Sequence, residues 1–240
     1  MISVSGVTKN FDEVHALKEV NLDIATGEFV TIVGPSGCGK STLLRIIAGL
    51  IDPTEGHINK PQESMGAFVF QDAALLPWRT VQKNAELLME LEDGFSKEER
   101  VTRVSSALQQ VGLSGFEKSY PHQLSGGMKM RLSLARALVL RPEYLLLDEP
   151  LSAVDELTRE LLQEEIHALW NEEKFTAILV THNVAEAVFL SNKVVVMSSR
   201  PGEIVHVVDI PFKKRDQLLR SKAQFSKLVN DISGKLRSWK

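Results

Sequence analysis

Cysteine, tyrosine and long apolar runs are scarce in this sequence. Its 240 residues include one cysteine and two tyrosines. A single cysteine cannot form an intramolecular disulfide, which points to a reducing compartment. No apolar run approaches the ~18–20 residues of a membrane-spanning helix, and the apolar segments at residues 29–33 and 193–197 have the length of strands. The N-terminus lacks a basic segment followed by an apolar stretch, so we expect no signal peptide.

A strong excess of charge of one sign is also missing. The formal net charge is −3 and the pI is about 6.1, which argues against a surface built for the phosphate backbone, and we expect no nucleic-acid partner. With 43% hydrophobic and 25% charged residues, the chain is neither disordered nor fibrous. A chain of this length buries roughly 70–75% of its unfolded surface and needs no disulfide or metal to fold.

Apolar, β-branched segments alternate with helical patterns along the chain, and we find no internal repeat. This order predicts an α/β fold with a mostly parallel sheet. We expect strands at residues 2–7, 16–24, 28–33, 66–70, 144–147, 176–181, 193–198 and 203–210. We expect helices at residues 40–50, 81–92, 97–111, 128–140, 155–172 and 183–190, and in part of the C-terminal segment. The segment from about 80 to 141 has only helical patterns, which predicts a helical insertion between two stretches of one sheet.

A glycine-rich segment follows the expected strand at residues 28–33 and precedes a helical pattern. It consists of Gly34, Pro35, Ser36, Gly37, Cys38, Gly39, Lys40, Ser41 and Thr42 and matches GxxxxGK[ST]. Glycines let backbone N–H groups converge on phosphate oxygens, and the helix start adds a favourable dipole. Lys40 then reaches the β- and γ-phosphates, and Ser41 offers a hydroxyl to Mg²⁺. A glycine-rich turn with a chance lysine is the alternative, but both flanking elements favour binding of ATP or GTP.

Two adjacent carboxylates, Asp148 and Glu149, end the apolar run at residues 145–147. Ligands of open α/β sheets bind at the carboxyl ends of the strands. We therefore expect Asp148 to coordinate Mg²⁺ and Glu149 to polarise the water that attacks the γ-phosphate. A solvated acidic strand end is the alternative, although two neighbouring carboxylates repel each other.

A second loop, formed by Ser125, Gly126 and Gly127, opens the helical pattern at residues 128–140. A hydroxyl and bare N–H groups at a helix start attract anions. Taken alone, an N-capped helix after a glycine turn is the simpler interpretation. If two copies associate head to tail, each loop can instead close over the nucleotide that its partner holds, and twofold symmetry gives two equivalent sites.

These motifs together resemble, in kind and in order, those of the ATP-binding-cassette (ABC) ATPases, the nucleotide-binding subunits of membrane transporters. The resemblance covers nearly all of residues 1–210. It implies a P-loop NTPase cassette with a mostly parallel core sheet, an antiparallel β subdomain and a helical insertion subdomain. We expect the ABC ATPase domain to span residues 1–211, with the insertion at about residues 80–141.

The resemblance also implies a role for each motif. Residues 34–42 correspond to the Walker A loop and residues 145–149 to Walker B. Residues 125–127 correspond to the signature loop, which contacts the γ-phosphate held by the opposite subunit. Residues 152–155 resemble the D-loop at the dimer interface.

Three single residues outside these motifs match family positions. Gln71 matches the Q-loop glutamine that reaches Mg²⁺ and the attacking water, and His182 matches the switch histidine near the γ-phosphate. Phe11 falls where the family places an aromatic ring on adenine. A strand-ending residue is the alternative for Gln71, a hydrogen-bonded structural residue for His182, and core packing for Phe11. The implied catalytic residues are Glu149, His182 and Gln71, and the implied metal ligands are Ser41, Gln71 and Asp148.

Further segments resemble one subgroup, the importers of the nitrate, sulfonate and taurine type. Met128 stands where the family usually has glutamine, and this subgroup often has methionine there, whereas Met130 is less expected. Residues 199–202 (Ser-Arg-Pro-Gly) resemble a turn of the subgroup between the last two strands. Residues 71–81 include an exposed-looking Leu-Leu-Pro-Trp, and in the family this region receives the coupling helix of the transmembrane permease subunit. Ordinary packing of the helical insertion is the alternative.

The resemblance therefore implies an ATPase coupled to transmembrane transport, with ATP and Mg²⁺ as its cofactors. It implies the ATP-hydrolysing subunit of an importer for a small solute of the nitrate, sulfonate or taurine type. The implied partners are permease subunits, a second copy of the chain and a separate solute-binding protein, at the cytoplasmic face of the inner or plasma membrane. The alternatives are an exporter or lipid-trafficking ABC system, a soluble ABC ATPase, and a P-loop small-molecule kinase.

The C-terminal segment, residues 212–240, differs from the rest in charge. It has nine Lys or Arg and two Asp or Glu, a net charge of +7 that leaves −10 for the other residues. Apolar residues recur there at helical spacings and predict a basic amphipathic helix; they are Leu218, Phe225, Val229, Ile232 and Leu236. This helix either packs on the domain with a solvated basic face or attracts anionic lipid headgroups.

Overall fold

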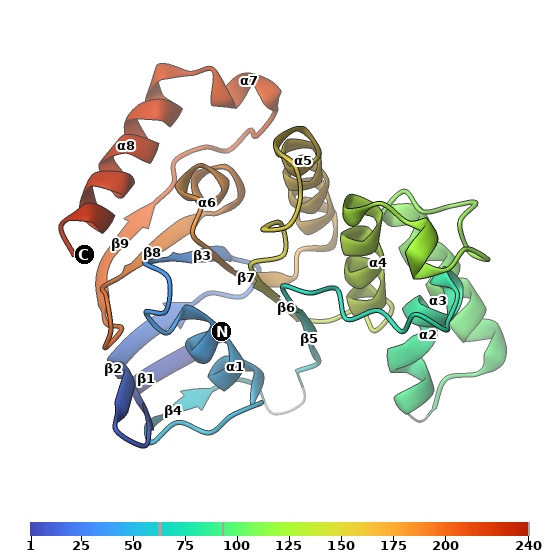
Figure 1. Ribbon diagram of the computed structural model, residues 1–240, viewed down its shortest axis with the longest axis horizontal. Helices are drawn as coiled ribbons and strands as arrows, with labels where there is room; N and C mark the ends of the chain where they lie inside the picture. The colour runs from blue at the N-terminus through green and yellow to red at the C-terminus, as the bar shows by residue number, and fades with distance from the viewer. Residues whose placement is uncertain (62–63, 93, 240) are drawn as a thin grey trace. The chain divides into compact units, whose positions relative to one another are not determined.

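The computed structural model describes residues 1–61, 64–92 and 94–239. The chain forms two compact units (Figure 1). The first unit combines Met1–Ser64 with Trp170–Lys240, and the second is Met65–Leu169. Lys240, the last residue of the expected basic segment, lies outside the described residues. The expected functional residues are divided between the two units.

The first unit contains an antiparallel sheet. Its strands are β1 (Ile2–Phe11), β2 (Val14–Ile24) and β4 (Glu55–Asn59), in the order β2-β1-β4. Strands β1 and β2 extend beyond the expected bounds and meet in a two-residue turn, in which Asp12 has a φ of 49°. Strand β4 was not predicted, because Ile58 alone among its residues is even partly buried. A strand this polar lacks the alternation of apolar residues by which strands are recognised.

The same unit contains the strands that carry the glycine-rich loop. They are β7 (Thr176–Thr181), β3 (Phe29–Val33), β8 (Lys193–Met197) and β9 (Ile204–Asp209), side by side in this order. Strand β3 pairs in parallel with β7 and β8, and β9 is antiparallel to β8. Every residue of β3 and β7 is buried, which is why both strands are continuous apolar runs rather than alternating ones. Helix α1 (Lys40–Ala48) follows β3, and helix α6 (Val184–Leu190) follows β7.

The C-terminal segment forms two helices, α7 (Gln217–Arg220) and α8 (Ala223–Arg237), where one amphipathic helix was expected. The expectation that Leu218 shares the apolar face is wrong, because Leu218 is 70% exposed and its neighbour Leu219 is buried instead. Helix α8 buries Phe225 and Ile232 and packs against α6 and β8 (Figure 1). The structure thus favours the packed arrangement of this helix.

The second unit combines a pair of parallel strands with helices. The strands are β5 (Gly66–Val69) and β6 (Tyr144–Asp148). Helices α2 (Val81–Leu91), α3 (Lys97–Gln110) and α4 (Gly126–Leu138) pack against one another, and a short 3₁₀ helix η1 (Pro121–Gln123) precedes α4 (Figure 1). Helix α5 (Glu156–Glu173) follows β6, and its part up to Leu169 belongs to this unit. The described residues between 80 and 141 contain helices and no strand.

The predicted fold class is confirmed: an α/β protein with a mostly parallel sheet, a separate antiparallel sheet and a helical region. The boundaries were less accurate, since α1 ends at Ala48 rather than residue 50 and α4 begins two residues earlier than expected. Among the helices that the structure describes, none has the length and apolar character needed to cross a membrane.

Candidate functional site

The glycine-rich loop joins β3 to α1 and is packed closely against β2. Gly37 and Gly39 have φ values of 75° and 106°, in the region that glycine adopts far more readily than other residues. A Cβ atom on Gly39 would lie 2.7 Å from the carbonyl oxygen of Ala16 and 2.7 Å from Cδ2 of Leu17. Both the backbone conformation and the close approach to β2 therefore require glycine at position 39.

Lys40, the first residue of α1, folds its side chain back over this loop. The residue is 4% exposed, and its Nζ donates to the carbonyl oxygens of Gly34 and Pro35, both at 2.9 Å. Its Nζ also lies 3.9 Å from the Sγ of Cys38. Burial raises the pKa of the Cys38 thiol, against the opposing effect of the Lys40 charge. The loop thus holds a buried cation beside a neutral thiol.

His182 leaves the sheet at the same edge as the glycine-rich loop. Strands β3 and β7 are parallel and Val33 is opposite Thr181, so Gly34 and His182 follow paired positions on neighbouring strands. The residue after His182 is fixed: the side chain of Asn183 caps α6 by accepting from the N–H of Glu186 at 3.1 Å. The exposed imidazole of His182 is therefore attached to a rigid strand–helix junction.

In the second unit, expected functional residues again follow the ends of paired parallel strands, here with acidic and amide side chains. Strands β5 and β6 are parallel and Val69 is opposite Leu147, so Gln71 and Glu149 each lie two residues beyond paired positions. Asp148 is buried at the end of β6. Glu149 has a φ of 46°, a left-handed conformation that is unfavourable for a residue with a side chain and is often found at functional sites.

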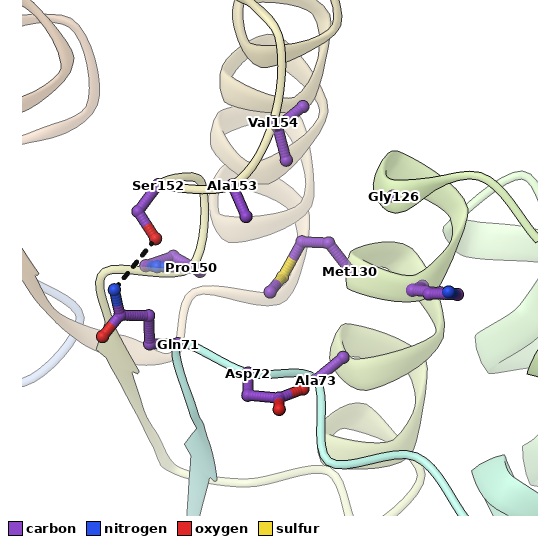
Figure 2. Close-up of a pocket in the computed structure, with 10 residues that line it drawn as sticks. Gln71, Asp72, Ala73, Gly126, Met130, Pro150, Ser152, Ala153 and Val154 are labelled. Carbon is purple, nitrogen blue, oxygen red and sulfur yellow. Dashed lines mark hydrogen bonds between the residues drawn. The ribbon is translucent and has the colours of Figure 1, made fainter. Parts of the chain in front are cut away.

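A cavity of about 350 Å³ lies in the second unit between three of the expected motifs (Figure 2). It is lined by residues 71–73, by Gly126, Lys129 and Met130 of α4, and by Pro150 and residues 152–154. Within it, the Nε2 of Gln71 donates to the Oγ of Ser152 at 3.3 Å. The fold therefore brings Gln71, the start of α4 and the segment after Glu149 together.

The start of α4 is an N-capped helix whose first residues remain accessible. The Oγ of Ser125 accepts from the N–H of Met128 at 3.3 Å, and Ser125 and Gly126 are exposed. A Cβ atom on Gly127 would lie 2.8 Å from Cγ2 of Thr158, whereas one on Gly126 would approach nothing closer than 3.9 Å. A side chain at 127 would therefore have to displace Thr158, while the surface at Ser125 and Gly126 is open.

Phe11 ends β1 with 45% of its surface exposed, so the core-packing alternative for this ring is wrong. The Nζ of Lys9 lies 5.0 Å from the centre of the Phe11 ring and also donates to the carbonyl oxygen of Asp52 at 2.7 Å. An exposed ring beside a cation is available to a flat ligand.

Two arginines that hold loops were not recognised from the sequence. Arg200 donates from Nε and Nη2 to the carbonyl oxygen of Gly37, at 3.0 and 2.8 Å. Arg136 donates to the carbonyl oxygens of Ala74 and Ala73, at 2.9 and 2.7 Å. A single sequence carries no signal that separates an arginine bound to a distant carbonyl from one that faces solvent.

Comparison with known proteins places the chain in a family. The sequence profile of the family described as ABC transporter matches residues 17–152. The uncharacterized ABC transporter ATP-binding protein MJ0412 of Methanocaldococcus jannaschii is 45% identical over 96% of this chain and 90% of its own length. The aliphatic sulfonates import ATP-binding protein SsuB of Bacillus cereus is 45% identical over 87% of this chain and 85% of its own.

Solved structures agree with the sequence relatives. The ATP-binding cassette MJ0796, solved as a dimer in a post-hydrolysis state with ADP and Pi, is 35% identical, with a TM-score of 0.76 over 88% of this chain and all of that one. The protein cbiO1 of Clostridium perfringens, part of the ABC transporter complex cbiONQ, is 26% identical, with a TM-score of 0.79 over 97% of this chain and 98% of that one. The phosphate-loop pattern, the Asp148–Glu149 strand end and these likenesses together show that the chain belongs to the ABC transporter family, as an ATP-binding cassette that hydrolyses ATP.

Proposed function

We propose that this chain is the ATP-hydrolysing subunit of a membrane importer for a small solute of the sulfonate, taurine or nitrate type. The observation that carries the proposal is the 45% identity, over 87% of the chain, to the sulfonate import protein of Bacillus cereus. In this role the chain works as a peripheral subunit at the cytoplasmic face of the inner or plasma membrane. A separate solute-binding protein delivers the solute.

In this proposal the first unit binds the nucleotide. Residues 34–42 surround the phosphates, with Lys40 directed to the β- and γ-phosphates and the exposed ring of Phe11 stacked on adenine. Ser41, Asp148 and Gln71 supply hydroxyl, carboxylate and amide oxygens for Mg²⁺. These hard oxygen donors fit a cation that is usually bound by one or two carboxylates together with substrate phosphates.

The residues that act on the reacting water are Glu149, Gln71 and His182. Glu149 accepts a proton from the water and orients it, and its strained backbone supports a functional role for the residue. Gln71 positions the same water, and His182 contributes a hydrogen bond at the γ-phosphate. The firmly held ends of β6 and β7 fit side chains that must be placed to within a fraction of an ångström.

A second copy of the chain completes the site in this proposal. The exposed Ser125 and Gly126 at the start of α4 offer a hydroxyl and N–H groups to the γ-phosphate bound by the partner copy. The dimeric state of the related cassette MJ0796 supports the association of two copies. Hydrolysis removes the bridging γ-phosphate, so the two copies separate.

The segment at residues 71–81 is the proposed docking site for the permease subunit. Trp78 is 72% exposed, yet the backbone around it is held by hydrogen bonds to the side chain of the buried Asn84. The side chain of Asn84 accepts from the N–H of Leu76 at 2.8 Å and donates to carbonyl oxygens on both sides of Trp78. An exposed tryptophan on a rigid segment is typical of a residue that anchors a partner, and the relative cbiO1 is part of a transporter complex.

The test uses membrane vesicles that contain the chain with its permease subunits and the solute-binding protein. We expect ATP-dependent uptake of an alkanesulfonate, taurine or nitrate, and none of maltose. Glu149→Gln should lower uptake and ATP hydrolysis by at least ~100-fold, because it removes the general base, while ATP still binds and the variant elutes as a dimer in gel filtration. Glu143→Gln is the matched control, since Glu143 is an exposed glutamate just before β6.

The outcomes separate the parts of the proposal. ATP-driven efflux, or uptake of none of the three anions, would overturn the importer assignment. A Glu149→Gln variant that hydrolyses ATP at the normal rate, or that remains monomeric with ATP, would overturn the proposed site.

A further inference from the structure

The turn between β8 and β9 packs directly against the glycine-rich loop at residues 34–42, which is called the phosphate loop from here on. The N–H of Gly202 donates to the carbonyl oxygen of Ala16 at 3.0 Å, and the N–H of Lys18 donates to the carbonyl oxygen of Gly202 at 3.1 Å. These two bonds fix the turn to β2. A Cβ atom on Gly202 would lie only 2.1 Å from the carbonyl oxygen of Cys38, so the turn approaches the phosphate loop as closely as a glycine allows.

Arg200 reaches from this turn to the exposed tip of the phosphate loop. Its Nε and Nη2 both donate to one acceptor, the carbonyl oxygen of Gly37, at 3.0 and 2.8 Å. The tip has few other restraints, because Ser36 and Gly37 are exposed and glycine has more backbone freedom than any other residue. The arginine thus contacts the loop at its exposed tip.

The bonded carbonyl also fixes the orientation of the next N–H group. In a trans peptide the C=O and N–H of one plane point in opposite directions, so holding the oxygen of Gly37 directs the N–H of Cys38 into the loop. There it lies 3.3 Å from the carbonyl oxygen of Pro35, a long bond that closes the turn at residues 35–38. The paired, shorter bonds from Arg200 are the stronger restraint on this peptide.

We propose that Arg200 is a positioning residue for nucleotide binding, because it holds the Gly37–Cys38 peptide in the orientation that the phosphate loop uses. The inference rests on the proposed placement of the nucleotide at residues 34–42. A loop that is already ordered loses less entropy when it binds a ligand. Since the loop contacts the phosphates before and during hydrolysis alike, loss of the restraint weakens ATP binding without slowing the bound enzyme.

The test compares ATP affinity with turnover in matched variants of the full-length protein. For Arg200→Ala we expect the Kd of a fluorescent ATP analogue and the KM for ATP to rise about tenfold, with kcat within about twofold of the parent. Arg200→Lys keeps the charge and a single donor group and should restore part of the affinity. Lys18→Ala is the control for charge, because Lys18 is an exposed cation beside the same turn, paired with Glu203 at 3.2 Å; its Kd should stay within about twofold.

Hydrogen exchange provides a readout that does not depend on activity. The N–H of Cys38 should exchange faster in Arg200→Ala than in the parent, while the N–H groups of β3 keep their protection. An unchanged Kd and unchanged exchange at Cys38 would overturn the proposal. An equal loss of affinity in Lys18→Ala would also overturn it, since net charge alone would then explain the effect.

Lys40→Ala distinguishes a failure of the role proposed for Arg200 from a failure of the nucleotide site itself. If Lys40→Ala binds ATP normally, residues 34–42 are not the nucleotide site. If Lys40→Ala loses ATP binding while Arg200→Ala matches the parent, the site is correct and the role of Arg200 is wrong.

Discussion

Arg136 and Arg200 both hold loops by binding backbone carbonyl oxygens, but they do so in different environments. Arg136, in the second unit, is 8% exposed and divides its bonds between Ala73 and Ala74, next to Gln71. Burial lowers the pKa of its guanidinium. Arg200, in the first unit, is exposed and gives both bonds to Gly37.

The difference in exposure determines what each contact contributes. If Arg136 is removed, the fold loses a buried charged side chain and its two bonds, which are part-buried, and a hydrogen bond to a charged group contributes about 1.5–3 kcal/mol. If Arg200 is removed, water can replace both bonds, so the folded state loses little. With the role proposed for Arg200, the same interaction therefore stabilises the fold in one unit and orders the proposed nucleotide-binding loop in the other.

The largest expected effect is that of Arg136→Ala. We expect the free energy of unfolding of the second unit to fall by about 2–4 kcal/mol, with faster exchange of the N–H groups in residues 72–76. The measurement is hydrogen exchange as a function of urea concentration, because it reports each unit separately. A global unfolding curve would combine the two units and would not give a single free energy.

Arg131→Ala is the matched control on the same helix. The Nη2 of Arg131 pairs with Oε1 of Glu165 at 2.6 Å, with both side chains partly exposed. Such pairs contribute at most about 1 kcal/mol, and the loop at residues 72–76 should be unaffected. If Arg131→Ala and Arg136→Ala destabilise the second unit equally, burial does not explain the contribution of Arg136.

A smaller effect is expected for Asn84→Ala, which removes an uncharged anchor from the same unit. Asn84 is fully buried and bonds to the backbone of Leu76, Arg79 and Thr80. We expect a loss of about 2 kcal/mol and faster exchange at residues 76–80. Binding to the permease subunit should weaken, whereas ATP affinity should not change.

Gln82→Ala, at a partly exposed position of the same helix, should leave permease binding and the exchange at residues 76–80 unchanged. Normal permease binding by Asn84→Ala would show that the Trp78 segment does not need to be rigid. Order in this segment would then not matter for binding, in contrast to the role proposed for order in the phosphate loop.

The parts of this molecule that sequence alone predicts have a local cause. The continuous apolar runs of β3 and β7 follow from burial on both faces, and the glycines of the phosphate loop follow from its backbone conformation and close packing. Because parallel strands end at one edge, the expected positions of Gln71 and Glu149 at corresponding strand ends also follow.

The parts that sequence does not predict depend on distant partners. Strand β4 forms because β1 offers it hydrogen bonds, although only Ile58 of its residues is even partly buried. Leu218 and Leu219 are adjacent and chemically identical, and only the packing of the C-terminal helices determines that Leu219 is the buried one. Arg200 and Gly37 are 163 residues apart, so no local pattern connects them.

The smallest expected effect concerns the reactivity of Cys38, which reports how tightly the phosphate loop is closed. Burial favours the neutral thiol and raises its pKa, so the thiolate becomes the main form only at a higher pH than for an exposed cysteine. The stabilisation of the folded state that comes from this shift is fully present at a pH below the thiol pKa of the unfolded chain. It is lost as the pH rises through the higher thiol pKa of the folded chain. Alkylation by iodoacetamide should therefore be slow at pH 7 and rise with pH to a midpoint above that of an ordinary exposed thiol.

The substitutions of Arg136 and Arg200 should affect the rate of Cys38 alkylation differently. Arg200→Ala should speed alkylation of Cys38 about threefold, because the loop beside the thiol opens more often, and bound ATP should slow alkylation in every variant that binds it. Arg136→Ala should leave the rate unchanged under conditions in which the second unit is still folded. Once Cys38 is alkylated, ATP turnover should stop, because the added group occupies the space beside Lys40 and Gly34. If Arg136→Ala speeds the reaction as much as Arg200→Ala does, the turn that carries Arg200 does not determine how tightly the phosphate loop is closed.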